Sequence, residues 1–176
     1  MSEAIRQVIL TGLPGSGKST IGRALAERIG WDLVDLDGEI VRRAGRSVSR
    51  IFAENGEERF RDLEALATSE LRNRQRVVIA PGGGWITRPA TVSLLRPPAK
   101  LVYLRVAPEV AAQRIREVSA ERPLLSGSDL LVRLSSLLMV REGAYSTADL
   151  TVNAERIVDE VLTQCMAWLV SERMVP

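Results

Sequence analysis

The sequence predicts an α/β protein with a mainly parallel sheet and helices on both of its faces. Short apolar blocks of strand length alternate with longer amphipathic stretches along most of the 176 residues, as in consecutive βα units. A glycine-rich loop follows the first block and opens the first helical stretch. The length and a hydrophobic fraction of 45% predict one compact domain over residues 1–176.

The expected elements follow from periodicity and from helix-breaking residues. The predicted strands are residues 8–11, 33–35, 77–80, 101–104 and 150–152. The predicted helices are residues 17–29, about 38–73 with breaks near Gly45 and Gly56, a stretch that opens at Pro108, residues 130–142, and 154 to about 170. Residues 119–129, which hold a proline and three serines, are expected to form a loop between helices.

The composition excludes several classes of protein. The chain has no histidine, which removes Ser-His and Cys-His nucleophiles and His-ligated zinc sites. No apolar run approaches the roughly 20 residues of a membrane span, and the N-terminus lacks a signal-peptide pattern, so we expect a cytoplasmic protein with no membrane partner. A net charge of +2 with scattered arginines does not indicate a nucleic-acid partner. The lone Cys165 can form no internal disulfide.

The strongest motif is G-x-x-x-x-G-K-[ST] at residues 12–19, between a predicted strand and a predicted helix. Such a loop wraps its backbone N–H groups around phosphate oxygens, and the helix N-terminus favours their negative charge. Lys18, one of only two lysines, would reach the β and γ phosphates, and the Ser19 hydroxyl would reach Mg²⁺. The sequence therefore predicts nucleoside triphosphate binding. The expected contacts are Gly15, Ser16, Gly17, Lys18, Ser19 and Thr20.

Two carboxylates follow the second predicted strand, where open α/β sheets place their ligands. Alternation in an extended Asp35-Leu36-Asp37 segment would put both side chains on the same side. One could then serve Mg²⁺ and the other an acceptor hydroxyl. The Asn-Lys-x-Asp motif that GTPases use to read the base is missing.

Six motifs together resemble the shikimate kinase family across essentially the whole chain. They are the loop at 12–19, Asp35-Leu36-Asp37, Phe60-Arg61, the triple glycine 82–84, Arg122-Pro123-Leu124-Leu125, and Arg141 followed by Tyr145. The resemblance implies a three-layer P-loop kinase fold with five parallel strands in the order 2-3-1-4-5. It further implies an acceptor-binding helical region at about 38–74, a mobile lid at about 119–129, and transfer of phosphate from ATP to the 3-hydroxyl of shikimate on the route to chorismate and the aromatic amino acids.

Two arginines are candidates for holding the acceptor. Shikimate is a carboxylate with several hydroxyl groups, and a planar guanidinium grips a carboxylate with two hydrogen bonds. The resemblance implies this role for Arg61 and Arg141. It also implies that the backbone N–H of Gly83 faces the acceptor, where a Cβ would block the approach.

The resemblance also implies the residues of the chemical step. Asp37 would hold and deprotonate the acceptor hydroxyl, while Lys18 and the lid residue Arg122 would stabilise the transferred phosphoryl group. Asp35 would reach Mg²⁺ together with Ser19. Arg114 resembles an arginine that stacks on adenine, and the spacing also permits Arg116. The expected assembly is a monomer.

Two other functions remain open at this stage. A sensor domain could keep the kinase architecture without turnover, although Lys18, Asp37 and both arginines are present. Another small-molecule kinase, acting on gluconate or a nucleoside monophosphate, would keep the chemistry and change the acceptor. Trp85 is bulkier than expected directly after the glycines, and it either narrows the acceptor pocket or packs in the core.

Overall fold

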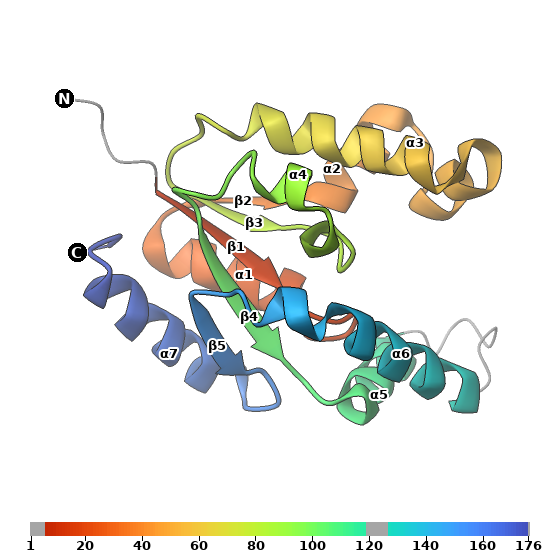
Figure 1. Ribbon diagram of the computed structural model, residues 1–176. Coiled ribbons are helices and arrows are strands. Elements are labelled where there is room, and N and C mark those ends of the chain that lie inside the picture. Colours follow the sequence, from red (N-terminus) through yellow and green to blue (C-terminus); the bar gives the residue numbers. More distant parts are fainter. Residues whose placement is uncertain (1–5, 119–126, 176) are drawn as a thin grey trace.

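A five-stranded parallel sheet forms the centre of the computed structural model, which describes residues 6–118 and 127–175 (Figure 1). The strands are β1 (Gln7–Thr11), β2 (Asp32–Asp35), β3 (Val77–Ala80), β4 (Lys100–Arg105) and β5 (Leu150–Asn153). Their order in the sheet is β2-β3-β1-β4-β5, and every neighbouring pair is parallel. The predicted fold class and strand order are confirmed.

Helices lie on both faces of this sheet. They are α1 (Lys18–Ile29), α2 (Leu36–Ala44), α3 (Val48–Glu70), α4 (Pro89–Val92), α5 (Pro108–Val118), α6 (Gly127–Tyr145) and α7 (Val158–Ser171), with a short 3-10 helix η1 (Trp85–Thr87). In these described ranges no helix combines the length and the apolar character needed to cross a membrane.

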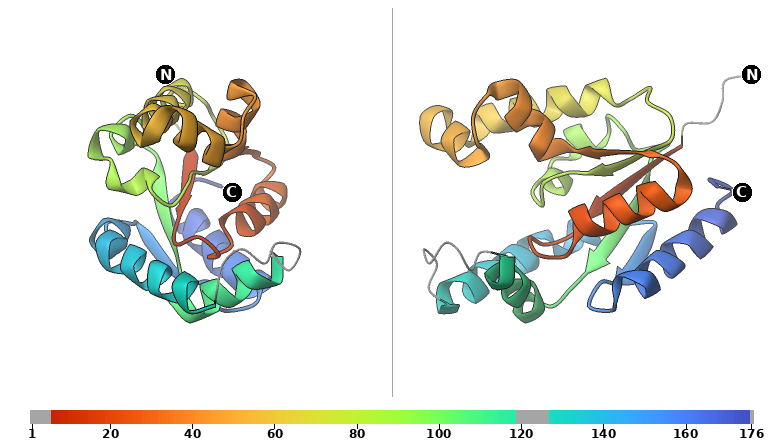
Figure 2. Two further views of the ribbon diagram at one scale, coloured as in Figure 1. Left: turned by 90° about the vertical axis from the view of Figure 1, so that its right-hand side faces the viewer. Right: turned by 180° about the vertical axis from the view of Figure 1, so that it is seen from behind.

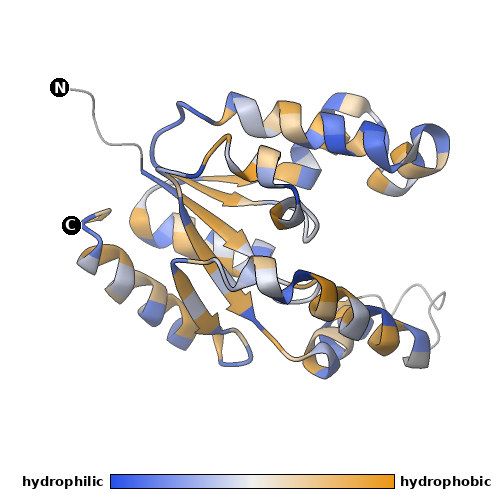
Figure 3. Ribbon diagram, viewed as in Figure 1, coloured by the Kyte–Doolittle hydropathy of each residue, from blue (hydrophilic) through white to orange (hydrophobic). Residues whose placement is uncertain are grey.

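The alternation of β1 side chains divides the core into two layers. Val8 and Leu10 pack with α1 and α7 on one face, whereas Ile9 packs with residues of α2, α3, α5 and α6 on the other. Both views in Figure 2 show α1 and α7 on the side of the sheet opposite α6 and η1. The central strands β3, β1 and β4 are mostly apolar (Figure 3), as expected where both faces of a parallel sheet are covered, whereas the edge strands β2 and β5 are apolar at two of their four positions.

Several predicted boundaries differ from the structure. The loop predicted to reach Asp129 ends sooner, because α6 begins at Gly127 and continues to Tyr145. Residues 119–126, with Arg122, lie outside the described residues. The last helix begins at Val158 and not at Ala154, because Ala154 still bonds to β4, its N–H donating to Arg105 O, and a turn follows before α7. The short helices η1 and α4 were not predicted.

The breaks predicted within the region after β2 are confirmed. Gly45 ends α2 in a left-handed conformation with φ 63°, and Gly56 kinks α3 with φ 79°. The kink separates the first turns of α3 from the part that carries Phe60 and Arg61. This second part runs beside the loop that follows β3, where the glycines lie (Figure 1).

Candidate active site

The loop between β1 and α1 has the geometry of a phosphate-binding loop. Gly15 has φ +80°, and a Cβ there would lie 2.6 Å from the carbonyl oxygen of Ala111 in α5, so the position requires glycine. Gly17 then caps α1, and Ser19 and Thr20 are exposed in its first turn. The loop therefore presents a helix N-terminus with two hydroxyl groups to solvent.

Lys18 folds back over this loop. Its Nζ donates to the carbonyl oxygens of Gly12 and Leu13, each at 2.9 Å. Burial lowers the pKa of Lys18 to about 8, against the opposing effect of the carboxylates of Asp37 and Asp35. The ammonium group is thus held at the end of β1 between the loop and two acidic side chains. A phosphate bound to the loop would therefore meet a partly desolvated cation.

The two carboxylates after β2 are arranged differently from the prediction. Asp35 ends the strand and caps α2, with Oδ1 accepting from the backbone N–H of Gly38 at 3.1 Å. Asp37 already lies in the first turn of α2, so the expected alternation along one extended segment is wrong. The chain adopts the cap because the cap satisfies a backbone N–H group at the start of α2, which an extended segment would leave without a partner.

Asp37 has the character of a reactive carboxylate. Burial raises the pKa of Asp37, and the nearby Asp35 carboxylate raises it further, while Lys18 acts in the opposite direction. Its Oδ1 is buried and has no hydrogen-bond partner within the described part of the chain. Such an atom is available to accept a hydrogen bond from a ligand.

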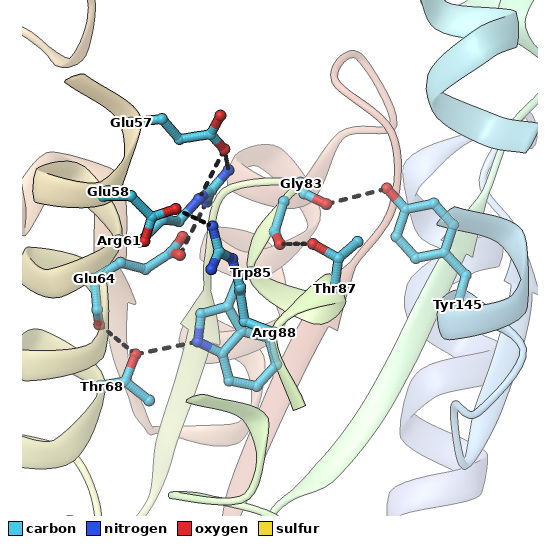
Figure 4. Close-up of polar contacts among 11 residues, drawn as sticks. Glu57, Glu58, Arg61, Glu64, Thr68, Gly83, Trp85, Thr87, Arg88 and Tyr145 are labelled. Atoms are coloured by element: carbon cyan, nitrogen blue, oxygen red, sulfur yellow. Dashed lines mark hydrogen bonds and ion pairs between the residues drawn. The ribbon is translucent and has the colours of Figure 1, made fainter. Parts of the chain in front are cut away.

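Arg61 is fixed by two glutamates of its own helix (Figure 4). Its Nε and Nη2 donate to Oε1 of Glu57, at 3.2 and 3.0 Å, and its Nη1 donates to Oε2 of Glu64 at 3.0 Å. A guanidinium has five N–H donors, so one N–H on each terminal nitrogen remains for a ligand. The Phe60 ring supports the group from 5.5 Å.

Arg141 comes from the last turns of α6, together with Tyr145. The Tyr145 hydroxyl donates to the carbonyl oxygen of Gly83 at 3.3 Å, and its ring stacks on Tyr103 of β4 at 4.8 Å. This contact ties α6 to the glycine loop (Figure 4). Arg141 lines the same cleft as Arg61 and the glycine loop.

Each glycine of the triple glycine lies against one of these side chains. A Cβ at Gly82 would be 2.9 Å from both carboxylate oxygens of Asp37. One at Gly83 would be 2.9 Å from Nη1 of Arg141, and one at Gly84 would be 2.6 Å from Nη2 of Arg61. The loop therefore lies against functional groups from three helices, α2, α6 and α3.

Comparison with known proteins agrees with this geometry. The family model for shikimate kinase matches residues 14–170. The chain belongs to the shikimate kinase family. The shikimate kinase of Geobacter sulfurreducens is 42% identical over 165 residues, which cover 93% of this chain and 91% of that protein.

Solved shikimate kinases have the same fold. The structure of the Acinetobacter baumannii enzyme in complex with shikimate has a TM-score of 0.86 at 32% identity and covers 97% of this chain and 96% of that chain. The structure of the Bacteroides thetaiotaomicron enzyme has a TM-score of 0.88 at 29% identity, covering 94% and 99%. A gluconokinase from Sinorhizobium meliloti, 18% identical with a TM-score of 0.63, shares the fold.

Five of the six motifs contribute residues to one cleft of about 480 Å³, and the sixth, at 122–125, lies outside the described residues. The cleft contains Asp37, Arg61, the three glycines and Arg141, together with apolar side chains of α3 and α6. Sequence reasoning selected Gly83 alone and missed Gly82, Gly84 and the two glutamates that hold Arg61. The run of three glycines was itself the available signal, because a flexible turn rarely needs three. A larger hollow of about 660 Å³ beside β5 contains none of the predicted site residues.

The structure describes only some of the nucleotide-binding residues that were predicted outside the loop. Nη2 of Arg114 donates to the carbonyl oxygen of Ala154 at 2.7 Å, which puts this side chain beside the turn between β5 and α7. Arg122 lies outside the described residues. Trp85 is 1% exposed and packs in the core, so it does not narrow the cleft.

The donor set fits a magnesium ion bound together with a nucleotide. Within residues 6–118 and 127–175 no three His, Cys, Asp or Glu side chains are grouped as a metal cage. Mg²⁺ in kinases is commonly held by one or two protein oxygens plus phosphates and water. The exposed Ser19 hydroxyl and the Oδ2 of Asp35, whose Oδ1 is engaged in the cap, suit that arrangement.

Proposed function

We propose that this protein transfers the γ-phosphoryl group of ATP to the 3-hydroxyl of shikimate, giving ADP and shikimate 3-phosphate, on the route to chorismate and the aromatic amino acids. One observation carries the proposal: three side chains that suit a hydroxylated carboxylate meet on one glycine loop beside a phosphate-binding loop. Arg61 and Arg141 would hold the acceptor carboxylate, each with N–H groups directed at the loop. The backbone N–H of Gly83 would complete the binding of the acceptor.

The acceptor hydroxyl is proposed to face Asp37. As the new O–P bond forms and the bond to the β-γ bridging oxygen breaks, the hydroxyl proton passes to the Asp37 carboxylate. Because burial raises the pKa of Asp37, its carboxylate is a better proton acceptor than an exposed aspartate. Lys18 and the backbone of residues 15–20 hold the phosphates, and Arg122 and Arg114 are proposed to contact the phosphoryl group and adenine.

Ser19 and Asp35 would hold Mg²⁺ at the phosphates. When bound, the ion supplies charge neutralisation to the phosphoryl group. We further propose a single domain over residues 1–176, with acceptor binding at about 38–74 and a lid at about 119–129. A cytoplasmic monomer is the proposed state, and a chain with one buried cysteine and no internal disulfide suits that compartment.

A substrate panel tests the function. ADP release is measured with ATP and Mg²⁺ in the presence of shikimate, gluconate, AMP or no acceptor. Turnover that requires shikimate is expected, because the acceptor must place its carboxylate on Arg61 and Arg141 and a hydroxyl group at Asp37 at the same time. Equal turnover with AMP, or tight shikimate binding with no ADP release, would refute the proposal in favour of another kinase or a sensor.

A further inference from the structure

Trp85 connects the glycine loop to the helix that carries Arg61 (Figure 4). It follows Gly84 directly as the first residue of η1, and its side chain is 1% exposed. The indole Nε1 donates to Oγ1 of Thr68 at 3.1 Å, and this hydroxyl in turn donates to the carbonyl oxygen of Glu64 at 2.6 Å. Both donors are thus satisfied in a buried chain of hydrogen bonds that ends on α3.

The position of this contact on α3 matters for Arg61. Arg61, Glu64 and Thr68 are spaced three and four residues apart, so they share one face of the helix. Glu64 and Thr68 are both fully buried. A shift of α3 at Thr68 would therefore move Arg61 and its partner Glu64 together.

The space above Gly84 leaves little freedom for such a shift. The Cβ position of Gly84 lies 2.6 Å from Nη2 of Arg61, so the guanidinium rests directly on the loop backbone. A second link from the same segment, between Arg88 Nη2 and Glu58 Oε1 at 3.0 Å, is exposed. Exposed ion pairs hold geometry weakly. The buried indole contact is the stronger restraint.

We propose that Trp85 is a positioning residue of the acceptor site. The hydrogen bond from its indole fixes the position of α3 relative to the glycine loop, so that the two remaining N–H groups of Arg61 face the cleft. The inference rests on the proposed role of Arg61 in binding the acceptor carboxylate. Trp85 thus influences acceptor affinity without contacting the acceptor, and it leaves the nucleotide loop unaffected.

Three single variants test the contact through shikimate affinity, measured by calorimetry. Trp85→Phe keeps most of the ring volume and loses the N–H donor, so shikimate affinity should fall about fivefold. Thr68→Val removes the acceptor and leaves the indole N–H unpaired, so its loss should be larger. Thr68→Ser keeps the hydroxyl and should bind shikimate as the wild type does. All three should bind ATP normally, and the Phe and Val changes combined should cost no more than Thr68→Val alone.

Two controls make the result decisive. Leu169→Ala empties a core position on the opposite face of the sheet, and it should lower Tm without changing shikimate affinity. Arg61→Lys should weaken shikimate binding whether or not Trp85 matters. If Arg61→Lys binds shikimate normally, that result refutes the proposed function and not the role of Trp85. The inference is overturned if Trp85→Phe binds shikimate normally, if ATP affinity falls equally, or if Leu169→Ala shows the same loss. Should Trp85→Phe not fold, Thr68→Val against Thr68→Ser decides by the same criteria.

Discussion

Gly84→Ala should separate acceptor binding from stability. The new Cβ would lie 2.6 Å from Nη2 and 3.0 Å from Nη1 of Arg61. Ordinary contact begins at 3.4 Å, so the guanidinium must move by about 0.8 Å. Its movement is restrained mainly by the buried Glu64, which accepts from Nη1, since the exposed Glu57 holds the other two N–H groups more weakly. A displacement of ~1 Å at a positioned group can cost about 10² in rate, and we expect the shikimate KM to rise by about one to two decades.

The backbone at this position accepts alanine without strain. Gly84 has φ −86° and ψ −13°, an ordinary helical conformation. Replacing glycine by alanine in a compatible conformation stabilises a protein by about 0.4–1 kcal/mol through the unfolded state. This gain partly offsets the cost of moving Arg61. The variant should therefore keep a urea midpoint close to that of the wild type and lose shikimate affinity nevertheless.

Steady-state kinetics and urea unfolding on the same samples test this reasoning. Gly143→Ala is the matched control, because it lies in α6 and nothing lies within 4 Å of its Cβ position. It should keep both KM values and gain stability. A Gly84→Ala enzyme with an unchanged shikimate KM would show that Arg61 does not bind the acceptor in the position described.

Three further predictions address single groups. Arg141→Lys should weaken shikimate binding by about 1.5–3 kcal/mol and spare ATP, since an ammonium cannot form the bidentate contact; equal losses for both ligands in calorimetry would contradict this. As pH rises through about 8, Lys18 loses its proton, so kcat/KM for ATP should fall on the alkaline side. Lys18→Arg keeps its charge, and the alkaline limb should disappear from whatever activity remains. Asp37→Asn should lose on the order of 10² to 10⁴ in kcat/KM for shikimate while the fold and ATP affinity persist, and rescue by added Mg²⁺ would make Asp37 a metal residue instead.

The sheet and the phosphate-binding loop could be predicted because their determinants are local. Buried parallel strands are short apolar runs, and residues 12–19 have a fixed spacing between a strand and a helix. Glycines at positions 45 and 56 likewise mark breaks through their own backbone conformation. Each of these features depends on a few adjacent residues.

The arrangement around the triple glycine could not be derived in the same way. Nothing near Gly82 in the chain says that Asp37 of α2 will lie above it, because that contact depends on how α2 packs on the sheet. The same holds for the bond from Trp85 to Thr68, which joins residues 17 positions apart. The expected alternation of Asp35 and Asp37 along an extended segment failed for a local reason: strand continuation and helix capping competed at Asp35, and the cap prevailed.

Because three helices meet on one loop, the geometry of the acceptor site depends on how all three of them pack. Asp37, Arg61 and Arg141 belong to three helices that share no hydrogen-bonded ladder, so their relative positions depend on side-chain packing and on their common contact with the loop. Loosening of any one helix would disperse the groups while the five strands remain paired. Catalytic competence in this fold thus requires more than a paired sheet, because all three helices must also be packed in place.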